Sequence, residues 1–256
     1  MFKYTENGAI ITFIFFRKKE GKRLKKDFLK GIKDGIPICL GYLSVSFGFG
    51  ILAVSLGFSI LAAVGISLTN LTSAGQVAGV GIIAAGGSLI EMALTQLVIN
   101  IRYSLMGISL SQKLDGNFNT FHRMAASFGI TDEIFAAAVS QKSVSPYYMY
   151  GLTAISALGW VSGTFLGAAA GNILPESISS AMGIVLYGMF LAIIIPPSKK
   201  EKGVLAAVLI AAALSTVFEY VLKSVSGGFA VIICSVLAAA ICAALFPVPD
   251  EEEAEG

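Results

Sequence analysis

The stretch SLIEMALTQLVINIRYSLMGISL, residues 88–110, decides the class of fold to which this chain belongs. It is apolar over a length that crosses a bilayer as one helix, for which about 20 residues are needed. Asn100 and Arg102 stand near its middle third. A guanidinium keeps its proton in proteins, and arginine at the centre of a membrane helix costs about 2.5 to 3.5 kcal/mol on insertion scales. The sequence therefore predicts a polar partner for Arg102: water, a carboxylate or an anionic ligand.

Two carboxylates stand at Asp132 and Glu133, where Thr131 opens another apolar stretch. Two uses of Arg102 stay open: contact with an anionic ligand, or a structural ion pair with one of these carboxylates. Consecutive helical residues point about 100° apart, so we expect only one of the two to face Arg102. For the other we expect a role in the first turn of the following helix. Neighbouring carboxylates repel one another, which raises the pKa of one of them and suits ion or proton coupling.

Composition places the chain in a membrane. Hydrophobic residues make up 55% of the chain, charged residues make up 13%, and the mean hydropathy is +0.80. Soluble domains carry about 25% charged residues. The chain has 256 residues and no extended polar stretch for a separate soluble domain. We therefore predict an all-α, polytopic integral membrane helical bundle of about 6–8 membrane segments, with at least one broken or half-helix.

Several classes of function lack their motifs in this chain. No GxxxxGK[ST] loop occurs, which excludes an ATPase of the chain's own. The single histidine, His122, excludes an HExxH zinc site and bis-histidine haem ligation within one chain. An intramembrane protease needs paired aspartates, a zinc motif or a serine–histidine pair, and only Asp132 lies near an apolar segment. Cys39, Cys234 and Cys242 lie in apolar segments without CxxC spacing. We expect no enzyme, no metal and no cofactor.

Segments of membrane-spanning length recur along the chain, each of roughly 20 residues or more. Those that we expect to cross the membrane are Ile36–Phe58, Ser59–Gly86, Ser88–Leu110, Tyr147–Ala170, Ser177–Ile195, Val204–Leu222 and Gly228–Phe246.

The second of these segments is interrupted by polar residues and glycines, as in the broken helices with which transporters bind substrate. We predict non-helical backbone between about Asn70 and Gln76, facing a cavity, because lipid-exposed backbone cannot stay unpaired. A shorter apolar stretch, Glu133–Val144, is a candidate half-helix stopped by Pro146. The residues from Ser111 to Ile130 are predicted to form a long polar loop.

Charge is segregated along the chain. Ten of the 18 Lys and Arg residues fall between positions 3 and 33, and the chain ends in an acidic run. Because basic residues before a first membrane segment stay in the cytoplasm, we expect a cytoplasmic N-terminus that contacts anionic lipid and binds no nucleic acid. The predicted division is a basic N-terminal segment (1–34), a transmembrane transporter domain (35–247) and an acidic C-terminal tail (248–256). The apolar run Gly8 to Phe16 is too short to span, and we expect an interfacial helix or an extension there.

Glycine recurs every four residues on the segment Tyr147–Ala170 and makes one smooth helix face. Such faces let two helix backbones approach closely. We expect this face to pack within the same chain, with docking of a second subunit as the alternative. Its members are Gly159, Gly163, Gly167 and Gly171.

Several other aromatic and charged side chains are predicted to have structural roles and no part in a functional site. Trp160 and the pair Tyr147-Tyr148 are predicted to anchor the chain at the membrane interface. Glu91 lies in the same apolar run as Arg102, but about three helical turns away, so the two cannot pair directly. We expect Glu91 at an interface, without a function.

The polar clusters follow a recognisable order. They are Gly35-Ile-Pro37, Gly41-Tyr42, Phe47-Gly48 and Gly50 in the first segment, Ser67 and Gln76 in the second, Asn100-Ile-Arg102 with Leu105-Met-Gly107, and Thr131-Asp132-Glu133. In this order and spacing the chain resembles the AzlC family of branched-chain amino-acid permeases, from about Gly31 to the fifth or sixth apolar segment. It departs from the family pattern at Leu71-Thr72-Ser73, Val77 and Tyr103, which puts the identity of the substrate in question.

The resemblance implies a secondary transporter subunit of the plasma membrane that exports valine, isoleucine, leucine or methionine. It also implies a small AzlD-type membrane subunit as partner, with a higher oligomer as a further option. A site for such an amino acid needs a cation for the carboxylate, acceptors for the ammonium and an apolar pocket. We expect substrate binding by Arg102, Asn100, Gln76, Ser73, Asn70 and Ser67, and ion or proton coupling by Asp132 and Glu133. The alternative is a structural or assembly subunit without a substrate site of its own.

Overall fold

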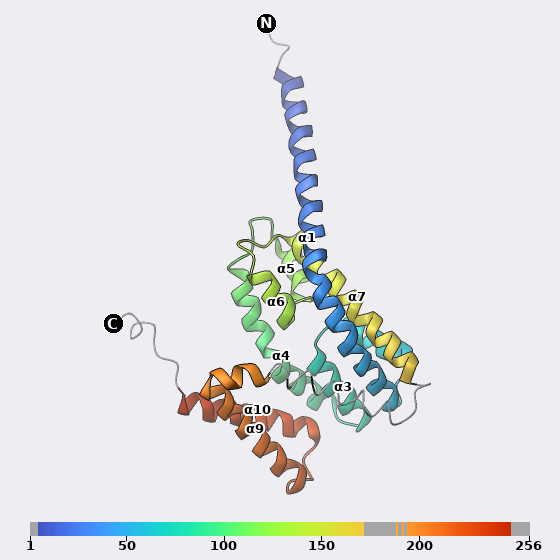
Figure 1. Cartoon of the computed structure of the whole chain (residues 1–256), viewed down its shortest axis with the longest axis vertical. Coiled ribbons are helices and arrows are strands. Elements are labelled where there is room, and N and C mark those ends of the chain that lie inside the picture. Colours follow the sequence, from blue (N-terminus) through green and yellow to red (C-terminus); the bar gives the residue numbers. More distant parts are fainter. Residues whose placement is uncertain (1–4, 172–187, 189–190, 192–193, 247–256) are drawn as a thin grey trace, which may run out of the picture. The chain divides into compact units, whose positions relative to one another are not determined.

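The structure is a computed structural model that describes residues 5–171, 188, 191 and 194–246, with side chains from Arg23 onward. Helices make up most of the described chain (Figure 1). The chain divides into two compact units. The first unit consists of Met1–Ser46, Ser67–Leu71 and Arg102–Gly163, and the second of Phe47–Ile66, Thr72–Ile101 and Thr164–Gly256. The helices α1, α4 and α7 each contribute residues to both units.

The first helix, α1, spans Thr5–Ser55 without a break. The predicted separate helix at Gly8 to Phe16 is therefore part of a longer one, and the predicted start near Ile36 is wrong. Pro37 lies inside the helix instead of near its first turn. Proline removes one backbone hydrogen bond there, a loss that membrane helices tolerate through neighbouring groups. The helix also passes through residue 34, so the predicted domain boundary at that point stays a prediction.

The predicted break in the second apolar segment is confirmed. The helix α2 (Ile60–Thr69) and the helix α3 (Ser73–Ala84) are separated by non-helical backbone at residues 70–72. The break is shorter than predicted, because residues from Ser73 to Gln76 already belong to α3. The expectation that it faces a cavity stays a prediction.

The helix α4 spans Leu89–Ser111 and carries Asn100 and Arg102. The polar loop predicted after it is wrong in part, because the helix α5 (Thr120–Ser127) forms inside it. Asn119 begins this helix: its side-chain oxygen accepts a hydrogen bond from the backbone N–H of His122 at 2.9 Å. Capping of this kind satisfies a free backbone N–H at the start of the helix and stabilises a short helix.

The predicted half-helix is present as α6 (Asp132–Val139), and α7 follows at Pro146–Gly171. The helix α6 ends well before Pro146, which instead opens α7, where a missing N–H costs nothing. Towards the C-terminus, α9 spans Lys202–Tyr220 and α10 spans Gly227–Leu245.

In the described part of the chain, four helices are long and apolar enough to cross a membrane: Arg23–Ser55, Pro146–Gly171, Lys202–Tyr220 and Gly227–Leu245. Most of the predicted segment Ser177–Ile195, and the predicted acidic tail 248–256, lie outside the described residues. The chain is an all-α, multi-pass membrane protein.

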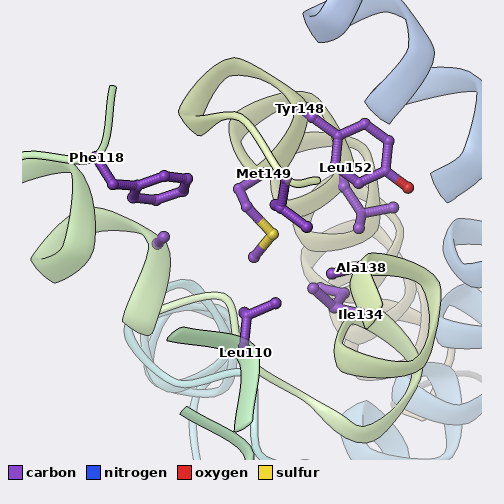
Figure 2. Close-up of a cluster of buried hydrophobic side chains, with 9 residues drawn as sticks. Leu110, Phe118, Ile134, Ala138, Tyr148, Met149 and Leu152 are labelled. Atoms are coloured by element: carbon purple, nitrogen blue, oxygen red, sulfur yellow. The ribbon is translucent and has the colours of Figure 1, made fainter. Parts of the chain in front are cut away.

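The core of the first unit gathers side chains from α4, α5, α6 and α7. Met149 lies between Phe118, Leu110 and Ile134 in the cluster shown in Figure 2. Tyr148 belongs to the same cluster and is buried, and Trp160 is only 1% exposed. The prediction of Tyr148 and Trp160 as interface anchors is therefore wrong, because both side chains fill the protein interior.

The glycine face of α7 packs against α1 of the same chain, as predicted, so docking of a second subunit on this face is wrong. In the first unit, a Cβ on Gly159 would overlap the carbonyl group of Cys39, and one on Gly163 would overlap that of Leu43. In the second unit, Gly167 meets Phe47 in the same way. Glycine is required at these positions because the two backbones are in contact.

Candidate functional site

The sequence predicted a polar partner for Arg102, and in the structure that partner is Asp132. In the first unit, Nη1 of Arg102 lies 2.6 Å from Oδ2 of Asp132, which is an ion pair between α4 and the start of α6. The side chain of Arg102 is 40% exposed and that of Asp132 is 29% exposed. The pair is thus only partly buried, and each group keeps access to its surroundings. A charged ligand can reach the guanidinium without unfolding the helices that hold it.

A second donor group of Arg102 contacts the neighbouring residue. Nη2 donates a hydrogen bond to the hydroxyl oxygen of Tyr103 at 3.2 Å, and the guanidinium carbon lies 4.9 Å from the centre of the Tyr103 ring. A cation over an aromatic face is attracted by the ring quadrupole, by about 0.5 to 2 kcal/mol. Tyr103 therefore fixes the orientation of the guanidinium, while Asp132 neutralises its charge.

The start of α6 explains why the two adjacent carboxylates have different partners. The hydroxyl oxygen of Thr131 accepts a hydrogen bond from the backbone N–H of Ile134 at 3.4 Å, so Thr131 is the cap of the helix. The capping role that the sequence suggested for one carboxylate is thus filled by the threonine. Asp132 pairs with Arg102, and Glu133 accepts a hydrogen bond at Oε2 from the hydroxyl of Tyr42 at 2.7 Å.

Tyr42 belongs to this site, although its position was not predicted from the sequence. Its hydroxyl also lies 2.5 Å from the hydroxyl oxygen of Thr131, so one buried phenol from α1 holds the cap and the second carboxylate together. The ring packs edge-on against Trp160, with ring centres 5.2 Å apart and planes at 76°. Leu71, from the break between α2 and α3, belongs to the same buried cluster. The only signal for Tyr42 in the sequence was its place in the motif Gly41-Tyr42.

Burial and two neighbouring charges act in different directions on the pKa of Asp132. Asp132 lies outside the four candidate membrane spans, and burial raises the pKa of its carboxyl above the usual range. The positive charge of Arg102 opposes this rise, and the negative charge of Glu133 adds to it. A carboxyl with a raised pKa takes up a proton at a higher pH than a free aspartate does, and protonation weakens its hold on Arg102.

The remaining predicted residues are distributed over both units. Ser67, fully buried, and Asn70 belong to the first unit, as Arg102 does. Ser73, Gln76 and Asn100 belong to the second unit. One common substrate site for all six stays a prediction.

In the second unit, Asn100 contacts Gln96, which was not among the predicted site residues. Its Nδ2 donates to Oε1 of Gln96 at 2.9 Å, and Nε2 of Gln96 donates to the carbonyl oxygen of Gly75 at 2.7 Å. The side chain of Gln76 is buried and donates to the carbonyl oxygen of Ile66 at 3.2 Å. These amides thus bind backbone groups on both sides of the break in the second segment. The spacing of Gln96 and Asn100, one helical turn, is the signal that could have shown the pair.

Comparisons with known proteins agree with this geometry. The sequence pattern of the AzlC protein family matches residues 37–174, which include Tyr42, Arg102 and Asp132. The inner membrane protein YgaZ of Escherichia coli K12 is 31% identical over 234 residues, which cover 88% of this chain and 94% of that protein. An uncharacterized membrane protein of Helicobacter pylori J99 is 27% identical over 176 residues, which cover 63% of this chain and 76% of that one.

No solved structure matches the chain. The family match and the relatives support a multi-pass membrane protein with a role related to membrane transport. Since the family pattern covers more than half of the chain, and YgaZ aligns over nearly its whole length, the chain belongs to the AzlC family.

Proposed function

We propose that the chain is the larger subunit of a secondary transporter that exports branched-chain or similar apolar amino acids, such as valine, isoleucine, leucine or methionine. The observation that carries the proposal is the partly exposed ion pair between Arg102 and Asp132. A guanidinium binds a carboxylate through two parallel hydrogen bonds. The carboxylate of the cargo therefore competes with Asp132 for Arg102, and the pair closes again when the cargo leaves.

Exchange of partners at Arg102 also offers a means of coupling. When cargo takes the guanidinium, Asp132 is left with an uncompensated negative charge, which favours uptake of a proton. Glu133 stands next to it in sequence and is held by the hydroxyl of Tyr42. We propose that this pair of carboxylates carries the coupling proton. The chain contains no nucleotide-binding loop, so the energy comes from an ion gradient or from exchange.

The setting proposed for this activity is the plasma membrane, with the basic N-terminal segment in the cytoplasm. A small AzlD-type membrane subunit is the proposed partner. We propose no enzymatic reaction for the chain. Asn100, Gln76, Ser73, Asn70 and Ser67 are retained as proposed substrate-binding residues, since amides and hydroxyls beside a broken helix can bind the ammonium group of the cargo.

Amino-acid pools inside cells test the proposal. Cells that express the chain together with its small partner are loaded with valine- and methionine-containing dipeptides, and the free amino acids inside and outside are measured. We expect lower internal pools than in cells with an empty vector. Equal pools of valine and methionine, with the protein present in the membrane, would favour the alternative of a structural or assembly subunit.

A further inference from the structure

A cavity of about 410 Å³ lies within the second unit, among the C-terminal half of α3, the start of α4 and the start of α10. Pockets for small ligands have volumes of about 300–1,000 Å³. The walls include the apolar side chains of Ala78, Ile82 and Val231. Glu91 is the only charged residue of the lining in the described part of the chain.

Glu91 is held at the start of α10. Its Oε1 accepts hydrogen bonds from the hydroxyl of Ser226 at 2.5 Å and from the backbone N–H of Gly228 at 3.0 Å. Glu91 is 5% exposed. The positive end of a helix favours an anionic group, so the start of α10 suits the carboxylate of Glu91. The expectation that Glu91 lies at an interface stays a prediction, while its buried contacts give it a defined place at the start of α10.

Two oxygen atoms at this cavity remain for a ligand. Both hydrogen bonds to the carboxylate end on Oε1, so within the described residues Oε2 of Glu91 is left for another donor. Thr95 lies one helical turn further along α4, on the same face. It is fully buried, lines the same cavity, and its hydroxyl oxygen has no hydrogen-bond partner among the described residues. A buried hydroxyl without a partner costs about 1–3 kcal/mol.

The chemistry of these groups selects the ligand. Oε2 is an acceptor only, so it requires a donor, and the single negative charge favours a donor that is positive. A hard metal ion fits less well, because such ions take about six or more oxygen ligands. Among the described residues, only Glu91, Thr95 and Ser226 bring side-chain oxygens to the lining, and Ser226 is already bonded to Glu91. An ammonium group needs only a few acceptors, and the apolar walls suit a short aliphatic body.

We propose that this cavity binds a primary ammonium group on a short aliphatic body, with Oε2 of Glu91 and the hydroxyl oxygen of Thr95 as acceptors. The ammonium group can belong to an aliphatic amine or to an aliphatic amino acid. The site goes beyond the proposed function and is separate from Arg102. Binding to it can be measured without transport.

Calorimetric titration of the purified full chain in detergent tests the site with three related probes. L-valine carries both the ammonium and the carboxylate, isobutylamine lacks the carboxylate, and isovalerate lacks the ammonium. In the Arg102→Ala variant, which lacks the proposed carboxylate site, we expect isobutylamine to bind and isovalerate not to bind. Binding of L-valine to this variant as well assigns amino acids to the site, and its absence restricts the site to amines. In the same variant, binding of isovalerate as tightly as isobutylamine, or no binding of isobutylamine, overturns the proposal.

Variants locate the binding. Glu91→Gln keeps the shape and loses the charge, so isobutylamine should bind at least about tenfold more weakly. Thr95→Val leaves the contacts of Glu91 with α10 in place and should weaken binding by about three- to tenfold. This second variant keeps the test valid if Glu91→Gln does not fold. Glu219→Gln, at an exposed carboxylate of α9, is the matched control and should bind as the unaltered chain does.

The outcomes separate this site from the proposed function. Unchanged isobutylamine binding in both Thr95→Val and Glu91→Gln overturns the site, whatever the cells export. Loss of binding in these variants, together with unchanged amino-acid pools in expressing cells, keeps the site and removes the proposed function.

Discussion

Arg102 and Asp132, which lie in different helices of the first unit, approach to 2.6 Å between Nη1 and Oδ2 while both side chains stay partly exposed. The exposure of the two side chains determines how much the pair can contribute to the free energy of unfolding. A fully buried ion pair that loses one partner costs about 3 to 5 kcal/mol, whereas exposed pairs contribute about 0 to 1 kcal/mol. A pair of this kind contributes little to folding, so its presence in an apolar region points to function.

The first prediction follows from that comparison. Arg102→Ala should lower the free energy of unfolding by only about 1 kcal/mol, because the pair is partly exposed. Thermal unfolding of the purified protein in detergent measures this. The same variant should no longer export valine. A loss of folded protein as severe as that of a core variant, such as Ile134→Ala, would contradict the functional role and make the pair structural.

The second prediction separates the two carboxylates. Asp132→Asn leaves Arg102 without its counter-charge, whereas Glu133→Gln keeps an acceptor for the hydroxyl of Tyr42. We expect Asp132→Asn to reduce export more strongly. The measurement is export of labelled valine or methionine, normalised to the protein in the membrane. If both variants export at the rate of the unaltered chain, neither carboxylate handles protons, and coupling lies elsewhere.

The third prediction concerns Tyr42, whose hydroxyl holds Thr131 and Glu133. Tyr42→Phe keeps the ring against Trp160 but removes both hydrogen bonds. The expected cost is about 1 to 3 kcal/mol in the free energy of unfolding, with reduced export. Tyr220→Phe is the control, because that side chain is 73% exposed. Equal unfolding temperatures and export rates for the two variants would remove Tyr42 from the site.

The fourth prediction tests the contact between α1 and α7. A methyl group at Gly159 overlaps backbone of α1, so Gly159→Ala should destabilise the fold by about 1–3 kcal/mol. Gly41 lies on α1 with open space around it, and Gly41→Ala should be neutral or stabilising by up to about 1 kcal/mol. Thermal unfolding of both variants gives the comparison. A Gly159→Ala protein as stable as Gly41→Ala would show that the backbones are not in contact.

Much of this arrangement can be predicted from local sequence. The break at residues 70–72 follows from the polar residues that interrupt an apolar segment, because such residues compete with helix formation where a membrane helix should be continuous. The ion pair follows from the cost of an unpaired guanidinium in an apolar run. Arg102 needed a partner, and the carboxylates at the start of α6 were the available ones.

Other features depend on tertiary contacts that local patterns do not contain. Tyr42 lies far from Glu133 in sequence, so only the packing of α1 beside α6 reveals their hydrogen bond. Ser88 and Glu91 have the spacing of an ordinary helix-capping pair, and Ser88 does bond the backbone N–H of Glu91. That spacing gives no sign that the carboxylate reaches Ser226 at the start of α10.

Export of labelled valine by cells that contain the chain and the proposed small partner tests the central claim most directly, with Arg102→Lys compared against the unaltered protein. Lysine keeps the positive charge but loses the two-pronged geometry with which a guanidinium binds a carboxylate. The account predicts that Arg102→Lys fails nearly as completely as Arg102→Ala, at equal amounts of protein in the membrane. Export by Arg102→Lys at the unaltered rate would contradict recognition of the cargo carboxylate by Arg102.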